Sequence, residues 1–269
     1  MIKKLKISTA TAIGKKTSNQ DSYILDKYYL SSQSNFEAYS KKIFPHKEDL
    51  AFAVFDGIGG LNNGDVASDV LANFTQEHLT DLKRPKPKKL EWYEDEALFQ
   101  FCDNATAEVK DQFEFGFTSG GTTFTAVILV NMKDGIQIRC LNVGDSPAYL
   151  LRNNTLTELT YEHTLAQYKR EQNCEKISVT DENTLLNYMG CPQIKGYEQM
   201  YFNKEELYLT KGDVILICSD GISKGLSREE IIDVLSKSRA KKKAENLIYT
   251  VLKKDASYID NMAAIVLSY

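Results

Sequence analysis

Apolar residues along this chain occur in two patterns, short runs and helical repeats. The short runs are rich in β-branched or aromatic residues, or alternate with polar ones, and Gly, Asn or Asp bounds them, which predicts β-strands. Such strands are expected at residues 7–13, 23–30, 50–55, 122–130, 136–143, 148–151, 214–218 and 263–267. The strands arrive in blocks along the chain.

Helical repeats mark the segments between these blocks. Apolar positions recur at helical spacing in residues 66–79, 98–113 and 244–252. The Pro-rich, charged stretch 81–92 predicts a loop that joins two of these helices, and Ser227 with Glu230 forms a capping box that opens a further helix. Because regular βαβ alternation is missing, we expect an α+β layered fold in which residues 1–269 form a single domain.

The composition is that of a globular chain. Its 269 residues are 42% hydrophobic and 26% charged, which is enough for a sizeable core. Lys and Arg number 33 against 37 Asp and Glu, a net charge of −4, so a nucleic-acid partner is not expected. The apolar runs stay far below the ~20 residues of a membrane span, and no apolar signal segment follows the N-terminal lysines. We therefore expect a cytoplasmic protein with no membrane partner.

Cysteine and histidine are poorly suited to carry chemistry in this chain. The five cysteines are scattered and form no CxxC pair, which is typical of a reducing compartment and argues against a disulfide framework or a zinc site. Neither HExxH nor GxSxG occurs, so zinc-protease and α/β-hydrolase chemistry lack their motifs. Catalysis would have to rest on carboxylates.

Four aspartates stand at the ends of expected strands. Asp56 and Asp220 follow strands directly and precede glycine. Asp145 lies between two strands, and Asp260 comes just before the last one. Side chains that converge there would repel one another unless cations lay among them, and carboxylates with a backbone carbonyl suit Mg²⁺ or Mn²⁺. Each Asp-Gly pair, taken alone, is better explained by an ordinary turn.

Six motifs in a fixed order carry a family resemblance. They read GKKTSNQDSYIL, FAVFDGIGG, SGGTTFTAVIL, LNVGDSPAYLL, LICSDGIS and DNMAAIVL. Nearly the whole chain, about residues 8–268, thereby resembles the metal-dependent protein serine/threonine phosphatases, the PPM or type 2C family, in their bacterial single-domain form. The resemblance implies a central β-sandwich of two antiparallel sheets flanked by helices on both sides, in four αββα layers. It also implies two divalent metal ions, Mn²⁺ or Mg²⁺, at one edge.

For the metal ions themselves, the resemblance implies that Asp56 bridges both and that the carbonyl oxygen of Gly57 binds the second. Asp220 and Asp260 would hold the first. The two ions would share a hydroxide that attacks phosphorus directly, without a covalent intermediate. Protonation of the leaving group would fall to metal-bound water, because Ile58 stands where some relatives have a histidine.

Supporting roles follow from the same resemblance. Gln20 and Asp21 match a pair that contacts the second metal largely through water, and Asn261 follows the last ligand as in the family. Asp145 matches an aspartate that, in many relatives, holds a third and weaker metal with an aspartate four residues after Asp220. The substrates would be proteins phosphorylated by a serine/threonine kinase, and we expect a monomer.

Three positions depart from the family pattern. Lys16 stands where the family has a phosphate-binding arginine, and it is either a catalytic residue that binds the phosphate or a solvated surface lysine. Lys224 replaces the partner of Asp145, and its ammonium would either lie near Asp145 as a substitute cation or face solvent. Pro147 removes a backbone donor. These departures motivate an alternative function as a catalytically weakened, phosphoprotein-binding regulatory module, and a small-molecule or nucleotide phosphohydrolase is a third candidate.

Two segments are interpreted through the resemblance alone. Residues 161–195 correspond to a variable flap that resembles a substrate-selecting lid in relatives. Within them, His163 matches a family segment, but a hydrogen-bonded structural histidine is the stronger interpretation. Residues 31–49 look like an extra loop.

Overall fold

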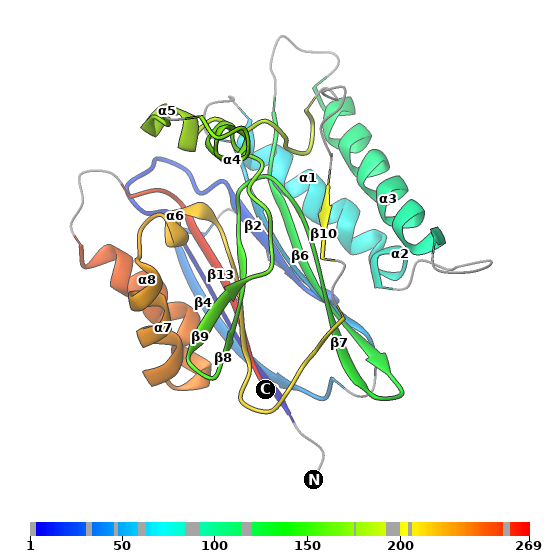
Figure 1. The fold of residues 1–269 in the computed structure, drawn as a ribbon, viewed down its shortest axis with the longest axis vertical. Helices are drawn as coiled ribbons and strands as arrows, with labels where there is room; N and C mark the ends of the chain where they lie inside the picture. Colours follow the sequence, from blue (N-terminus) through cyan, green and yellow to red (C-terminus); the bar gives the residue numbers. More distant parts are fainter. Residues whose placement is uncertain are drawn as a thin grey trace.

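Two β-sheets stacked face to face form the centre of the protein, and helices cover both outer faces (Figure 1). The computed structural model describes residues 4–30, 34–45, 48–58, 63–83, 92–113, 120–174, 176–191, 200–203, 206–254 and 259–269. The functional site lies at one end of this stack.

One sheet has six strands, and each neighbouring pair is antiparallel. In spatial order they are β4 (Phe36–Ile43), β1 (Leu5–Ala12), β13 (Met262–Ser268), β12 (Val214–Cys218), β8 (Ala148–Arg152) and β9 (Thr155–Glu158). The first and last strands of the chain therefore pair within this sheet, where Ala10 lies opposite Ala264.

The other sheet has seven strands and is also antiparallel. Its order is β10 (Tyr201–Phe202), β7 (Gly135–Val143), β6 (Phe124–Met132), β5 (Leu50–Asp56), β2 (Asp21–Leu25) and β3 (Tyr28–Leu30), and β11 (Leu207–Tyr208) also pairs with β7. The register of β2 on β5 sets Asp21 opposite Asp56, so two acidic residues share one end of neighbouring strands.

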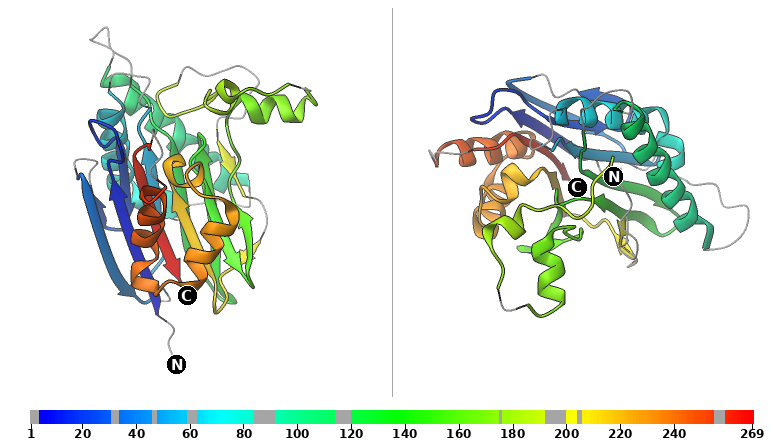
Figure 2. Two further views of the ribbon diagram at one scale, coloured as in Figure 1. Left: turned by 90° about the vertical axis from the view of Figure 1, so that its left-hand side faces the viewer. Right: turned by 90° about the horizontal axis from the view of Figure 1, so that it is seen from above.

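Helices pack on the outer face of each sheet (Figure 1). The second sheet carries α1 (Gly64–Glu77), α2 (Leu79–Lys83) and α3 (Trp92–Asp111). The first sheet carries α6 (Asp220–Ser223), α7 (Arg228–Lys237), the 3₁₀ helix η1 (Ala240–Lys242) and α8 (Lys243–Leu252). Two short helices, α4 (Leu165–Glu171) and α5 (Val179–Glu182), stand out from the end of the sandwich (Figure 2).

The alternation of side chains along each strand explains the layers. In β13, Ile265 and Leu267 point into the core between the sheets, whereas Ala264 and Val266 point toward α6–α8. Successive side chains of a strand face opposite sides, so a strand covered on both faces must be apolar at nearly every position. This confirms the expected α+β fold with four αββα layers, and it explains why the strands read as continuous apolar runs.

Most expected elements are present, but two expectations are wrong. The expected strand at residues 23–30 divides into β2 and β3, because Asp26 adopts a left-handed φ of 56° at the turn between them. Residues 36–43, expected to be loop, form the edge strand β4, which pairs with β1 along its whole length. Side chains of this edge strand are mostly exposed or half-buried, so their sequence lacks an apolar run.

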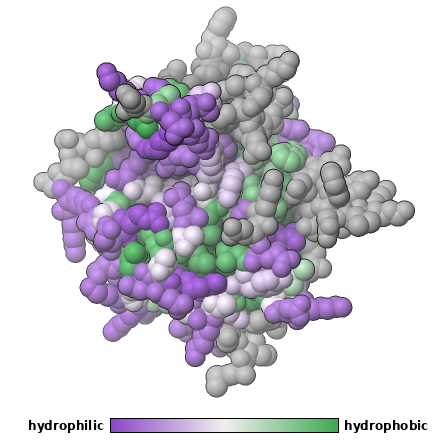
Figure 3. Space-filling view, in the orientation of Figure 1, coloured by the Kyte–Doolittle hydropathy of each residue, from purple (hydrophilic) through white to green (hydrophobic). Residues whose placement is uncertain are grey.

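The outer surface is largely polar. In the orientation of Figure 1, most of the described surface is hydrophilic, and apolar side chains show mainly across the middle of that face (Figure 3). Among the described residues, no helix has both the length and the apolar character needed to cross a membrane. Of the loop expected at 81–92, residues 81–83 belong instead to α2 and Trp92 begins α3, while residues 84–91 lie outside the described part of the chain.

Candidate metal centre

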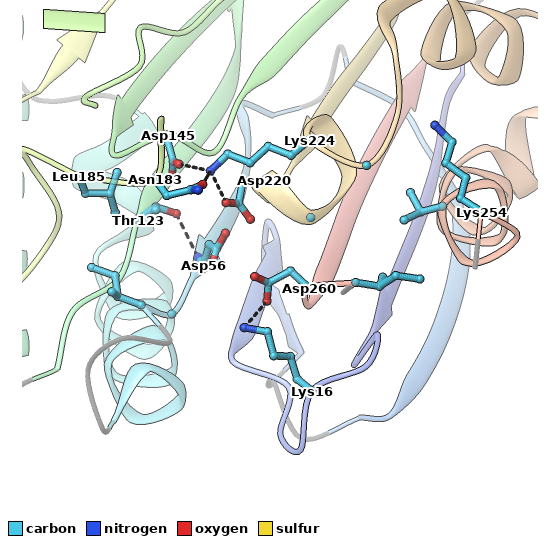
Figure 4. Close-up of a pocket in the computed structure, with 16 residues that line it drawn as sticks. Lys16, Asp56, Thr123, Asp145, Asn183, Leu185, Asp220, Lys224, Lys254 and Asp260 are labelled. Atoms are coloured by element: carbon cyan, nitrogen blue, oxygen red, sulfur yellow. Dashed lines mark hydrogen bonds and ion pairs between the residues drawn. The ribbon is translucent and has the colours of Figure 1, made fainter. Parts of the chain in front are cut away.

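A cavity of about 780 Å³ opens where strand ends of both sheets meet (Figure 4). Its lining includes eight of the residues singled out from the sequence, namely Lys16, Asp56, Gly57, Ile58, Asp145, Asp220, Lys224 and Asp260. They come from segments far apart in the chain: the loop between β1 and β2, the end of β5, the turn between β7 and β8, α6 with the residue after it, and the residues just before β13. The fold therefore brings the predicted carboxylates together.

Backbone contacts hold Asp56 and Gly57 at the end of β5. The N–H of Asp56 donates to Thr123 Oγ1 at 3.1 Å, and its carbonyl accepts from the Thr123 N–H at 2.8 Å. A Cβ on Gly57 would lie 2.2 Å from the carbonyl oxygen of Gly64 and 2.7 Å from that of Gln20. Only glycine permits the start of α1 to approach the strand end this closely.

Asp21 is the most deeply buried acid at the site. One of its carboxylate oxygens, Oδ2, accepts from Ser219 Oγ at 2.6 Å. The other, Oδ1, is buried and has no hydrogen-bond partner among the described residues. Burial raises the pKa of Asp21, and the charges of Asp220 and Asp260 raise it further. The neighbouring Asp56 carboxyl contributes a hydrogen bond that lowers this pKa, and a buried carboxylate oxygen with so little compensation is the kind of group that a cation would stabilise.

The same imbalance affects Asp56 and Asp145. Burial raises the pKa of Asp56, and Asp21, Asp220 and Asp145 add repulsion. Burial also raises the pKa of Asp145, and Asp220 adds to this while Lys224 opposes it. Carboxylates that raise one another's pKa values are held close by the fold despite their mutual repulsion. A bound cation would relieve this repulsion.

Two lysines supply part of the missing positive charge. Lys16 Nζ lies 2.9 Å from Asp260 Oδ1. Lys224 Nζ lies 2.7 Å from Asp220 Oδ2 and 3.0 Å from Asp145 Oδ2, so it occupies the substitute-cation position considered from the sequence (Figure 4). Burial opposes the charge of Lys224, but attraction to Asp145 and Asp220 outweighs it and raises the pKa of the ammonium.

The residues at the cavity have the chemistry of a hard-cation site. The lining carries the carboxylates of Asp56, Asp145, Asp220 and Asp260, and its described residues include neither imidazole nor thiol, which favours Mg²⁺ or Mn²⁺ over zinc. In the described part of the chain, no three His, Cys, Asp or Glu side chains converge on one point as they stand. Asp220 and Asp260 instead point toward lysines. The donor set and the unpaired oxygen of Asp21 nevertheless fit divalent ions.

Gln20 and Asn261 lie where β2 and β13 begin and act through the backbone. The side-chain amide of Asn261 donates to the carbonyls of Ile13 and Ser18, both at 2.9 Å, and its oxygen accepts from the Gln20 N–H at 3.0 Å. The Gln20 carbonyl accepts from the Gly57 N–H at 3.1 Å. Asn261 thus holds the loop that carries Lys16 against the strand that follows Asp260.

His163 is buried and structural. Its Nδ1 accepts from the N–H of Gly144 at 3.0 Å, and its carbonyl accepts from the N–H of Leu186. Burial lowers its pKa to about 4, so the ring is a neutral acceptor near neutral pH. It joins the turn that carries Asp145 to the flap segment.

The flap segment, residues 161–191, lies beside the cavity and contributes Asn183 and Leu185 to its lining. Its helices α4 and α5 are tied together by an ion pair between Lys169 and Asp181 at 2.7 Å. Residues 192–195 of the expected flap lie outside the described part of the chain.

Three contributors to the site were not anticipated from the sequence. Thr123 anchors Asp56, Ser219 binds Asp21, and Asn183 binds Lys224. The position of Ser219 directly before Asp220 was the feature of the sequence that could have identified it. Asn183 carries no such signal, because its partner is distant in the chain.

Comparisons with known proteins agree with this architecture. The family model described as Protein phosphatase 2C matches residues 38–253. The serine/threonine phosphatase stp of Listeria welshimeri is 29% identical over 215 residues, which cover 74% of this chain and 77% of that protein.

Solved structures of phosphatases share the fold. The catalytic domain of the serine/threonine protein phosphatase PstP, crystallised with two manganese ions, matches with a TM-score of 0.66 and 25% identity over 98% of each chain. The serine/threonine phosphatase of S. agalactiae matches with a TM-score of 0.74 and 20% identity over 98% of this chain and 99% of that one. With most of its length matched by the family model, this chain belongs to the protein phosphatase 2C family.

Proposed function

We propose that this protein is a metal-dependent phosphatase that hydrolyses phosphoserine and phosphothreonine in proteins. The observation that carries the proposal is the set of acidic side chains from both sheets around one cavity, with a buried oxygen of Asp21 left unpaired. Such a cluster opposes folding when no cations are bound, and it could hold the cations that phosphate hydrolysis needs.

The proposed metal ligands are the strand-end carboxylates. Asp56, Asp220 and Asp260 would hold two Mn²⁺ or Mg²⁺ ions together with the carbonyl of Gly57, and Asp21 would complete the set with its unpaired Oδ1. Gln20 supports the set through its backbone contact with Gly57. When bound, the two ions supply an activated water and neutralise charge on the phosphoryl oxygens.

Other residues of the chain would bind and orient the phosphate. Lys16 lines the cavity beside Asp260 and would attract the phosphate as a point charge, without the two-pronged geometry of arginine. Ile58 also lines the cavity and has no ionisable group, so the leaving group receives no proton from the side chain at that position.

The biological setting is proposed from the same site. The substrates would be proteins phosphorylated by a serine/threonine kinase, and the protein would act as a monomer in the cytoplasm. Its net charge of −4 gives no electrostatic reason to bind nucleic acid.

Hydrolysis of a phosphothreonine peptide, with Mn²⁺, with Mg²⁺ and with chelator, tests this function. Asp56→Asn and Asp220→Asn should each lower kcat/KM by roughly a hundredfold or more, because each removes an anionic ligand. Asp233→Asn is the matched control, since Asp233 pairs with Lys237 on the exposed face of α7 and should keep full activity.

Substrate class is tested in the same assay. Faster turnover of nucleotides than of phosphopeptides would redirect the proposal to small molecules. Folded native protein that turns over no better than Asp56→Asn with either metal would contradict the enzyme function and favour a phosphoprotein-binding module.

A further inference from the structure

Lys224 uses its whole ammonium group to join three parts of the protein. It lies one helical turn after Asp220, and its backbone N–H bonds the Asp220 carbonyl at 2.8 Å. Its Nζ lies 2.7 Å from Asp220 Oδ2, 3.0 Å from Asp145 Oδ2 and 3.2 Å from Asn183 Oδ1 (Figure 4). An ammonium has three hydrogens, so each has an acceptor here, and the acceptors come from α6, the β7–β8 turn and the flap segment.

The amide of Asn183 is oriented for this contact. Its nitrogen donates to the carbonyl of Val179 at 3.1 Å, which leaves the oxygen to face Lys224. Asn183 also ends α5, a helix whose start is fixed by the capping box of Ser178 and Asp181. Because the ion pair between Lys169 and Asp181 joins α4 to α5, a contact that fixes Asn183 restrains both helices of the flap segment.

A second lysine of the same cavity behaves differently. Lys254 also lines the cavity, but its Nζ pairs with Glu230 Oε2 on α7 at 2.6 Å. The two lysines therefore separate a general effect of positive charge near the cavity from the particular contacts of Lys224.

We infer that Lys224 is a tethered cation that bridges Asp145 and Asp220 and latches the flap segment to the metal centre through Asn183. Lys224 is thus a positioning residue. It neutralises an acidic pair that would otherwise need another cation, and it makes the position of the flap depend on the helix that carries a proposed metal ligand. The inference rests on the proposed function for the identity of the metal centre, but the latch itself concerns this chain alone.

Hydrogen exchange of the full-length protein in chelator tests the latch without any metal. Lys224→Met should make amides in residues 176–191 exchange about tenfold faster, because the charged hydrogen bond to Asn183 of the flap is lost. Asn183→Ala should do the same from the other side of the contact, with no change at a proposed metal ligand. Lys254→Met is the matched control and should leave this segment unchanged, and Lys224→Arg should restore most of the protection.

Unchanged exchange in both Lys224→Met and Asn183→Ala would overturn the latch. Equal acceleration in Lys254→Met would also overturn it, since the effect would then reflect general charge or stability.

Calorimetric titration with Mn²⁺ tests the tethered cation. Lys224→Asp places a third carboxylate beside Asp145 and Asp220, and this variant should bind one more Mn²⁺ per chain than the native protein. Equal binding by both would overturn the cation role of Lys224. Native protein that binds no Mn²⁺ would instead refute the proposed metal centre, while the exchange experiment would still decide the latch.

Discussion

At the scale of single residues, the site depends on the close approach of backbone atoms around Gly57 as much as on charge. Gly57 lies where the end of β5, the start of α1 and the residue before β2 come within contact of one another. The carbonyl of the preceding Asp56 is held by Thr123, so the strand end has little room to move. A side chain at residue 57 must therefore displace Asp56 or the start of α1.

Gly57→Ala should lower both stability and activity. The added Cβ would lie 2.2 Å from Gly64 O, so the backbone must shift, at a cost of roughly 1–3 kcal/mol. Displacement of Asp56 should lower kcat by about a hundredfold. Chemical denaturation and a phosphopeptide assay in Mn²⁺ measure the two effects.

Gly212→Ala is the control for backbone conformation. Gly212 has a φ of +97° and nothing within 4 Å of an added Cβ, so this change should cost roughly 1–2 kcal/mol in stability and leave kcat intact. Native kcat in Gly57→Ala would show that the close approach does not position Asp56.

At the scale of elements, the flap segment is attached to the sandwich at its base as well as through Lys224. His163 accepts a hydrogen bond from Gly144, next to Asp145, and its carbonyl holds Leu186. The same ring nitrogen lies 3.2 Å from the Gly144 carbonyl, but burial disfavours the charged ring and lowers its pKa from 6.5 to about 4. The attachment of the flap is therefore sensitive to acid.

The His163 contribution to stability should be complete above pH 6.5 and should disappear as the pH falls to about 4. Between these values the unfolded chain binds a proton that the folded chain excludes, so stability falls by at most about 1.4 kcal/mol per pH unit. The His163→Phe variant should be less stable than the native protein at pH 7, and its stability should change less with pH between about 4 and 6.5. His78→Gln, at the residue that follows α1, leaves the flap contact intact and should keep the native dependence of stability on pH. Urea denaturation across this pH range is the measurement, and an identical slope in His163→Phe would contradict the assignment.

At the scale of the whole molecule, the four layers bring acidic residues of two sheets to one end of the sandwich. The repulsion of Asp56 by Asp21 and Asp145 opposes folding, and among these three carboxylates Lys224 compensates the charge of Asp145. Cations that bind only the folded chain should therefore stabilise it.

Mn²⁺ at a hundredfold excess over its Kd should stabilise the protein by about 2.7 kcal/mol, which raises Tm by roughly 5–10 °C. Asp21→Asn should raise the Tm of the chelator-treated protein near neutral pH, because it removes a carboxyl whose pKa burial raises to about 8 and which folding must therefore protonate, and it should shrink the increase caused by Mn²⁺. Differential scanning calorimetry measures both, with Asp233→Asn as the surface control. A lower Tm for Asp21→Asn in chelator would show that the acidic cluster is not destabilising.

Prediction from the sequence succeeded where the signal was local. The strands covered on both faces, the helix that starts at Ser227 and the aspartates after β5 and β12 all follow from patterns within a few residues. The strand β4 was missed because an edge strand buries few side chains and therefore carries a weak pattern.

The sequence by itself determined the layered α+β class, the family resemblance and the strand-end aspartates that line the cavity, because these follow from local alternation and from ordered motifs. Only the tertiary structure decided which groups meet. The register of β2 on β5 places Asp21 against Asp56, and the folding of the flap over α6 selects Asn183 as a partner of Lys224. Such contacts depend on the register and direction of segments distant in the chain, and a local pattern reports burial and periodicity but not which distant group lies opposite.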